Sequence, residues 1–157
     1  MRRLAKIFGL AIVALILQMS VFAEDSDSEE IVSAKVFVYD RVTNELAREL
    51  VQYPFIFLDE SDADYRVIAD HLLTKKIVAK PRSQADLNDT KVRGVVDAQS
   101  GAKSALVGVK VMVLSGGECR ATWFWSANGF AGGGAVYVLR KKDDSWVVVR
   151  TEARFSE

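Results

Sequence analysis

Histidine and cysteine, the side chains that most often carry nucleophilic or metal chemistry, each occur once in this chain of 157 residues. With no second histidine or cysteine near His71, the sequence lacks a typical zinc site. No Gly-x-Ser-x-Gly motif supports a Ser-His-Asp hydrolase. We therefore expect no enzymatic activity, no catalytic residues, no metal and no cofactor. Cys119 is expected either to be buried in a strand or to pair between chains, since a lone thiol closes no disulfide within the chain.

Two other patterns resemble chemical motifs, but backbone geometry explains them. The carboxylate pairs Asp62/Asp64 and Asp143/Asp144 fall at an expected helix start and an expected turn, where aspartate is common. Residues 129–134, Gly-Phe-Ala-Gly-Gly-Gly, look like a phosphate-binding loop, but they lack the terminal Lys-Ser/Thr and lead into a strand. We interpret this run as a flexible or bulged connection between strands, which lets another backbone or a ligand approach closely.

Aromatic residues are the remaining candidates for binding. All three tryptophans lie in the C-terminal third of the chain, where they can line a pocket for an apolar ligand, anchor a partner protein or fill the core. Trp125 is nearest a loop and is expected to be the most exposed of them. Phe130, inside the glycine run, is expected to be an exposed aromatic. The candidate binding residues are therefore Trp123, Trp125, Phe130 and Tyr137, with core packing as the alternative for each.

Residues 1–23 have the pattern of an export signal. Three basic residues lie within the first six, an almost wholly apolar run follows, and small residues precede the expected cleavage between Ala23 and Glu24. An uncleaved anchor helix, the alternative, needs about 20 apolar residues, and this segment is shorter and contains polar residues. No cysteine follows the cut to take a lipid. We expect a periplasmic or secreted protein with no stable membrane anchor after cleavage.

The remaining chain is expected to form an acidic disordered tail over 24–30 and a single α+β domain over 31–157. The leader holds three of the 21 basic residues and none of the 21 acidic ones, so the rest carries a net charge of −3. Binding to nucleic acid requires a basic surface that replaces counterions around phosphate. We therefore expect no nucleic-acid partner.

Apolar residues recur at three- and four-residue steps after residue 31, which predicts a helix over 31–50 with a possible break near Thr43. A short aromatic and branched run predicts a strand over 53–58. Ser61 is the expected N-cap of a second helix that buries Ile68 and Leu72. Residues 77–104 contain many turn formers and are expected to be loop with one or two short strands.

The last third of the chain predicts an antiparallel meander. Four runs are alternating or rich in branched residues, and the turns at 115–117 and 142–144 are short enough for hairpins. The predicted strands cover residues 106–114, 118–126, 135–141 and 146–153. In the second strand, Cys119, Ala121, Trp123 and Trp125 share one face, which we expect to be the core side. The predicted fold is α+β, with N-terminal helices packed on a four-stranded or larger antiparallel meander.

Residues 96–101 (Val-Asp-Ala-Gln-Ser-Gly) and 132–148, which end in a basic stretch, an acidic turn, Trp146 and valines, resemble the ending of small exported bacterial proteins of uncharacterised function. The hairpin is also similar to the sheet of cystatin-like and nuclear-transport-factor-2-like cones, in which a helix packs on a curved antiparallel sheet. The resemblance covers residues 96–157 and implies that fold. It carries over no catalytic residues.

Three functions remain open at this point. The first is an exported non-enzymatic module that binds an unknown protein or a small apolar ligand through a concave sheet face or exposed aromatics. The second is an inhibitor or immunity-type protein that blocks another exported enzyme with a loop, for which 77–92 and 127–134 are candidates. The third is a small cone-fold enzyme that uses an acid beside Tyr137 inside a pocket.

Overall fold

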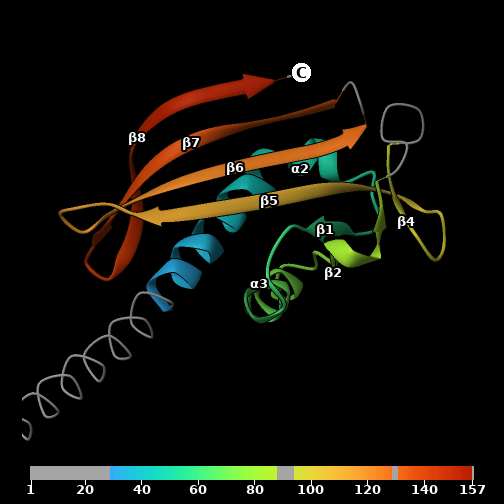
Figure 1. Ribbon diagram of the computed structural model, residues 1–157, viewed down its shortest axis with the longest axis horizontal. Coiled ribbons are helices and arrows are strands. Elements are labelled where there is room, and N and C mark those ends of the chain that lie inside the picture. The colour runs from blue at the N-terminus through green and yellow to red at the C-terminus, as the bar shows by residue number, and fades with distance from the viewer. Residues whose placement is uncertain (1–28, 88–93, 129–130, 157) are drawn as a thin grey trace, which may run out of the picture. The chain divides into compact units, whose positions relative to one another are not determined.

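Four long antiparallel strands, consecutive in the chain, form most of the sheet in the computed structural model, as Figure 1 shows. The structure describes residues 29–87, 94–128 and 131–156. The described elements are a helix over residues 29–45 (the N-terminal helix), α2 (Ala47–Leu50), β1 (Ile56–Leu58), α3 (Asp62–Thr74), β2 (Ala79–Pro81), a 3-10 turn (Arg82–Gln84), β3 (Ala85–Asp86), β4 (Val95–Asp97), β5 (Lys103–Val113), β6 (Glu118–Asn128), β7 (Ala131–Lys142) and β8 (Ser145–Ser156).

The predicted meander is confirmed over β5, β6, β7 and β8, each paired antiparallel with the next. The β7–β8 hairpin has a two-residue loop in which Asp143 (φ 49°) and Asp144 (φ 60°) are both left-handed. This is the backbone of a tight hairpin turn whose twist matches that of the strands, and aspartate tolerates it better than most residues. The sequence therefore forms the turn without the usual glycine.

The sheet is larger than the meander, and its first strands are parallel rather than antiparallel. The strand order along the main path is β2-β1-β5-β6-β7-β8, and β1 runs parallel to both β2 and β5. The helix α3 carries the chain from the end of β1 to the start of β2, which is the crossover that parallel neighbours require. The predicted antiparallel meander makes up most of the sheet, but the parallel pairing of β1 was not predicted, because the order of strands in space depends on this crossover.

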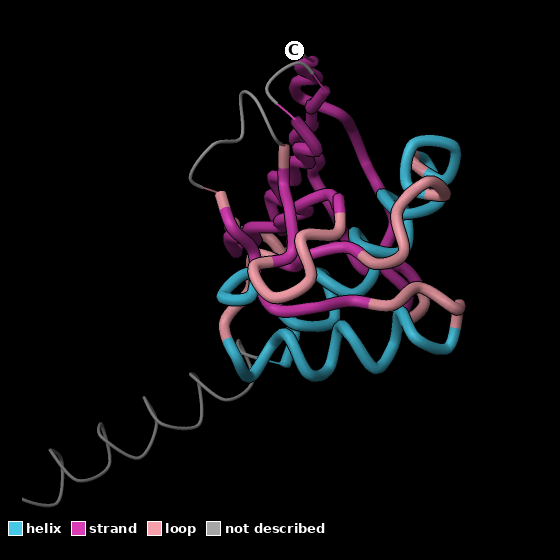
Figure 2. The backbone as a smooth tube through the Cα atoms, turned by 90° about the vertical axis from the view of Figure 1, so that its right-hand side faces the viewer, coloured by secondary structure: helices cyan, strands magenta, loops and turns pink. Residues whose placement is uncertain are grey.

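The helices pack on one face of the sheet and form the main core with it. Figure 2 shows the helices, in cyan, outside the strands rather than between them. The buried residues of this core include Val38, Tyr39 and Val42 from the N-terminal helix, Ile68 and Leu72 from α3, and Val107, Val109, Ala121, Trp123, Tyr137 and Leu139 from the sheet. Cys119 is also buried on this face, as its position in the strand pattern predicts.

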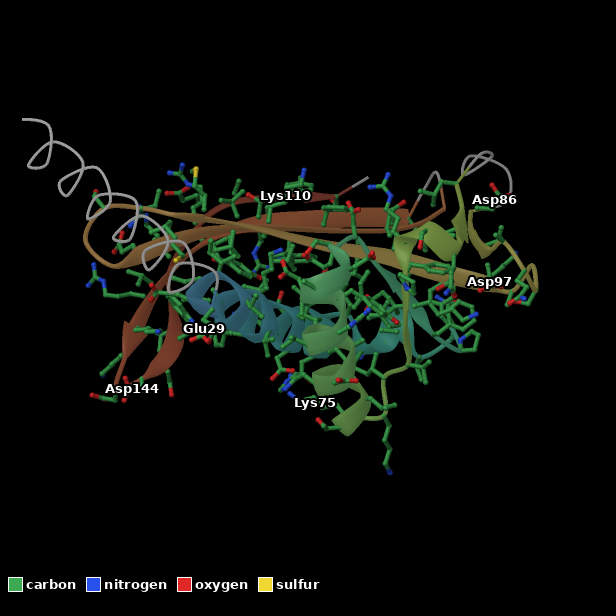
Figure 3. The ribbon with its side chains drawn as sticks, turned by 60° about the horizontal axis from the view of Figure 1, so that its bottom comes forward. Glu29, Lys75, Asp86, Asp97, Lys110 and Asp144 are labelled. Carbon is green, nitrogen blue, oxygen red and sulfur yellow. The ribbon has the colours of Figure 1, made fainter. Side chains whose placement is uncertain are left out.

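Over β6 to β8, the opposite face of the sheet is covered only by the side chains of the strands themselves. Lys110 projects from this face, away from the helices, whereas Lys75 lies on the helix side of the sheet (Figure 3). Phe57, Val95 and Leu106 form a smaller cluster against Phe124. Ion pairs join strands, from Arg120 to Glu152 at 2.9 Å and from Arg140 to Glu118 at 2.5 Å, and within β8 Arg150 pairs with Glu152 at 3.1 Å. Both faces are therefore partly covered.

The helix boundaries differ from the prediction by a few residues. The N-terminal helix already includes Glu29 and Glu30, which the sequence placed in the acidic tail. The break before α2 falls at Leu46 rather than near Thr43, whose hydroxyl instead donates to the Tyr39 carbonyl inside the helix at 2.8 Å. Ser61 caps α3 as predicted, accepting from the Asp64 N–H at 3.4 Å. In the described part of the chain, no helix has the length and apolarity that a membrane crossing needs.

The glycine run is mostly strand, not a connection. Strand β7 begins at Ala131, and the register with β6 shifts between Ser126 and Asn128. A Cβ added at Gly134 would overlap the Trp123 carbonyl oxygen and the Phe155 ring, and one added at Gly133 would lie 2.8 Å from the Phe155 carbonyl. The close approach that these glycines allow is therefore that of the chain's own strands.

Candidate functional site

A hollow of about 430 Å³ lies beside two of the predicted binding residues, at the end of the sheet next to α2. We call it the tryptophan hollow. Its lining consists of Leu46, Glu49, Trp123, Trp125, Gly132, Gly133, Gly134, Arg154, Phe155 and Ser156. Segments from four parts of the chain meet here: the residues around α2, and the neighbouring ends of β6, β7 and β8.

Strand register explains why these side chains meet. Trp123 and Trp125 are two positions apart on β6 and so point to the same face. Across the sheet Trp123 pairs with Ala135, which pairs with Arg154. Trp125 pairs with Gly133, which pairs with Ser156. Small residues on β7 thus separate the tryptophans on β6 from the polar end of β8, which leaves space above the middle strand.

Trp123 brings an unsatisfied polar atom to this wall. The residue is only 5% exposed, and its indole Nε1 is buried with no hydrogen-bond partner in the described part of the chain. A buried N–H without a partner costs about 1–3 kcal/mol, and such groups in folded proteins call for an explanation. By contrast, the buried Trp146 donates its Nε1 to the Ser33 hydroxyl at 3.1 Å.

Two charged side chains of opposite sign also line the hollow. Glu49 belongs to α2 and Arg154 to β8, and both are exposed. Neither side chain has an ion-pair partner within 4.0 Å among the described residues. The ring of Phe155, which is 48% exposed, lies over Gly134 and therefore on the opposite face of the sheet from Trp123 and Trp125. The hollow therefore combines the aromatic surface of the two tryptophans with one group of each charge.

Tyr137, another predicted binding residue, lies in the core rather than in a pocket. It is fully buried and its hydroxyl donates to Glu45 Oε2 at 3.1 Å. Arg41 pairs with the same carboxylate at 2.8 Å and lies over the Tyr137 ring. The acid beside Tyr137 is thus present, and neither of these two residues lines the tryptophan hollow. Packed core surrounds the tyrosine, which is the core-packing alternative for this residue.

Three other predicted site residues fall outside the described residues. Phe130 lies in the gap at 129–130, and the expected cleavage residues Ala23 and Glu24 precede residue 29. Conversely, sequence reasoning missed Glu49, Arg154 and Phe155. The last two were missed because the predicted strand stopped at Ala153, whereas β8 continues to Ser156. The last residues of β8 pair with the first residues of β7, which extends the strand to Ser156. The first residues of β7 include the glycines, so the sequence did not predict a strand there.

A second polar cluster is buried between the N-terminal helix, α3 and β5. Lys35 Nζ lies 2.6 Å from Glu60 Oε2 and 2.7 Å from Asp64 Oδ2. The Tyr39 hydroxyl donates to Glu60 Oε1 at 2.8 Å, and the Val109 N–H donates to the same oxygen at 3.3 Å. The Glu60 side chain is only 2% exposed. Because its carboxylate oxygens are occupied, this cluster joins three elements rather than offering a free reactive group.

The pKa values of this cluster follow from burial and charge. Burial, followed by the charge and hydrogen bond of Glu60, raises the pKa of Tyr39 well above its ordinary value. Burial lowers the pKa of Lys35, but hydrogen bonds to Asp64 and Glu60 outweigh it, so the pKa is raised overall. Both groups therefore keep their protons to higher pH than they would in water.

Asp97 is a buried carboxylate with a shifted pKa, and it organises a turn. Its Oδ1 accepts from the Ser100 N–H at 2.7 Å and from the Gln99 N–H at 3.1 Å, while Lys80 Nζ lies 2.5 Å from Oδ2. The hydrogen bond from Lys80 and that from the Ser100 backbone lower the pKa of Asp97 far below its ordinary value. These contacts fix the loop between β4 and β5.

The single histidine lies in the last turn of α3 and is partly exposed. His71 Nε2 is 2.8 Å from Asp40 Oδ1, and Lys75 Nζ is 2.5 Å from the other oxygen of the same carboxylate. These contacts connect α3 with the N-terminal helix. Within the described residues, no three side chains among histidine, cysteine, aspartate and glutamate are placed to hold a metal ion.

A larger hollow, of about 720 Å³, lies beside Asp59, Asp62 and Asp86. Its one basic residue, Arg82, pairs with Asp59 at 2.6 Å. A third hollow, of about 370 Å³, is lined mainly by apolar residues between Leu50 and Val78. The tryptophan hollow is the one of the three that brings together large aromatic side chains, a buried N–H without a partner and opposite charges.

Comparison of the chain with known protein families, with characterised proteins and with solved structures gave no match in any of these comparisons.

Proposed function

We propose that the protein is an exported, non-enzymatic binding module that holds a small ligand in the tryptophan hollow. The observation that carries the proposal is that Trp123, whose buried indole N–H has no partner among the described residues, lines that hollow. A ligand that brings an acceptor atom to this N–H removes the cost of leaving it unsatisfied. Pockets for small ligands are typically about 300–1,000 Å³, mostly apolar, with a few polar groups that fix orientation. The volume of the hollow falls within that range, and its lining combines aromatic and charged residues.

The scaffold around the hollow supports binding rather than catalysis. Trp123 and Trp125 project from a central strand of the sheet. Sites built on strands are held more rigidly than sites on loops, so the aromatic walls need little ordering when a ligand binds. The proposal therefore rests on shape and on three hydrogen-bonding or charged groups.

Export is the second part of the proposal and rests on residues 1–23. A positive start, an apolar run and small residues before Glu24 are what a signal peptidase requires. We expect the protein recovered from the periplasm or the culture medium to begin at Glu24, as read by intact mass. A product in the cytosol that retains Met1 would contradict export but would leave the hollow and its ligand unaffected.

Replacing Trp123 by phenylalanine tests the binding site directly. Phe keeps an aromatic ring and removes the N–H, so ligand affinity should fall about three- to tenfold, the worth of one hydrogen bond of about 0.5–1.5 kcal/mol. The measurement is equilibrium dialysis of the purified protein against a small-molecule extract of its source cells, with mass spectrometry to identify what the protein retains.

The matched control is Trp146→Phe, which also removes a buried indole but lies outside the hollow. This variant should lose stability and keep its affinity when the two are compared at equal folded fraction. Equal retention by wild type and Trp123→Phe would remove the hollow as the site. Retention of no small molecule, together with co-purification of an exported hydrolase, would replace the proposal by an inhibitor function.

A further inference from the structure

The charges in the tryptophan hollow narrow the class of ligand. Glu49 and Arg154 come from different elements, α2 and β8, and both line the same 430 Å³ space as the aromatic rings. Other charged side chains of the helices and the sheet are paired: Arg120 and Arg150 both contact Glu152, and Arg41 contacts Glu45. Glu49 and Arg154 are farther than 4.0 Å from any ion-pair partner among the described residues. Each is therefore able to pair with a group on a ligand.

We propose, on the basis of the binding function above, that the ligand is a zwitterion with an apolar body, such as a free amino acid with an aromatic or aliphatic side chain. Its carboxylate pairs with Arg154, whose guanidinium presents two parallel donors to a carboxylate. Its ammonium pairs with Glu49. Its apolar side chain lies against the Trp125 ring.

A ligand with one charge or none fits the same surroundings less well. A purely apolar molecule would cover both Glu49 and Arg154 and would not replace the hydrogen bonds to water that these groups lose. A partly buried charge without a partner is costly. A simple carboxylic acid would satisfy Arg154 but would lie near the negative charge of Glu49. A simple amine would satisfy Glu49 but would lie near the positive charge of Arg154. Only a molecule with both charges satisfies both side chains.

The experiment is calorimetric titration of the purified protein with matched probes. The zwitterions are L-phenylalanine, L-tryptophan and L-leucine. The two singly charged partners of phenylalanine are phenylalaninamide, which lacks the carboxylate, and N-acetylphenylalanine, which lacks the ammonium. We expect at least one zwitterion to bind, and each singly charged form of phenylalanine to bind about tenfold or more weakly than phenylalanine itself.

Two variants assign each charge to its partner. Arg154→Gln should lower the affinity for phenylalanine about tenfold and leave that for phenylalaninamide unchanged, because the amide has no carboxylate to lose. Glu49→Gln should lower the affinity for phenylalanine and leave that for N-acetylphenylalanine unchanged. Arg48→Gln and Asp70→Asn are the matched controls, since both residues are exposed and lie outside the hollow's lining.

The outcomes separate this inference from the proposed function. Equal affinities for phenylalanine and its two singly charged forms, or failure of all three zwitterions to bind, would overturn the zwitterion inference. If the dialysis experiment nevertheless finds a small molecule whose retention depends on Trp123, the binding function stands with a different ligand class. Loss of binding in the Arg48 control variant as large as in Arg154→Gln would also overturn the inference, because it would indicate a general charge effect.

Discussion

Replacing Glu60 by alanine is expected to lower the free energy of unfolding by about 3–5 kcal/mol, the usual cost of breaking a buried ion pair by removing one partner. The Glu60 carboxylate is 2% exposed and receives Lys35, the Tyr39 hydroxyl and the Val109 N–H. Its loss leaves Lys35 with Asp64 alone and leaves the Val109 N–H without this acceptor. Equilibrium urea unfolding followed by tryptophan fluorescence measures the change.

The control is Asp70→Ala, an acid on the exposed side of α3. Surface substitutions of this kind usually change stability by less than about 0.5 kcal/mol. If Glu60→Ala were no more destabilising than Asp70→Ala, the buried cluster would not hold the N-terminal helix against α3 and β5. The difference between the two variants is therefore the quantity to compare.

The same cluster predicts a loss of stability in alkali. The pKa values of Tyr39 and Lys35 are raised from ordinary values of 10.0 and 10.5. In the unfolded chain both groups lose their protons as the pH passes these ordinary values, whereas the folded protein retains them. Their contribution to stability is thus complete below about pH 10 and is lost as the pH rises toward the folded pKa values. Tyr39→Phe should make the decline above pH 10 shallower, and an unchanged slope would contradict this.

Gly134→Ala is the second substitution with a large expected effect, a loss of about 3 kcal/mol or more. The added methyl overlaps the Trp123 carbonyl oxygen, which belongs to the neighbouring strand, and the ring of Phe155. A backbone oxygen in the middle of a sheet cannot move aside without breaking the ladder between β6 and β7. Thermal and urea unfolding of the purified variant measure the loss.

Gly108→Ala is the matched control for this prediction. A methyl there meets mainly the tip of the Phe124 ring, a partly exposed side chain that can rotate away, so the loss should be about 1 kcal/mol. Adding Phe155→Ala to Gly134→Ala should recover only part of the loss, because the overlap with the carbonyl remains. Full recovery would show that the ring alone requires the glycine, and a stable Gly134→Ala would show that the strands can separate without cost.

The local elements of this protein follow from short-range patterns. Alternation along residues 118–126 predicted the core face of β6, and Cys119, Ala121 and Trp123 are buried there. Three- and four-residue spacing predicted the helices, and a serine followed by acids predicted the cap at Ser61. These predictions succeed because they depend only on neighbours within a few residues. Such neighbours set the direction of side chains in a strand and the hydrogen bonding of backbone N–H groups at a helix start.

Only the tertiary structure determined which distant residues meet. The parallel pairing of β1 with β5, and the meeting of Glu49 with Arg154 beside the tryptophans, join segments that lie from about 50 to more than 100 positions apart in the chain. The hydrogen bond of Tyr137 likewise joins it to Glu45, 92 positions away. Composition and periodicity specify the faces of single elements, whereas the crossover, the strand register and the packing of helices on the sheet depend on the energy of the whole chain. The sequence thus determined the parts and their buried sides, and the packing between those parts created the hollow.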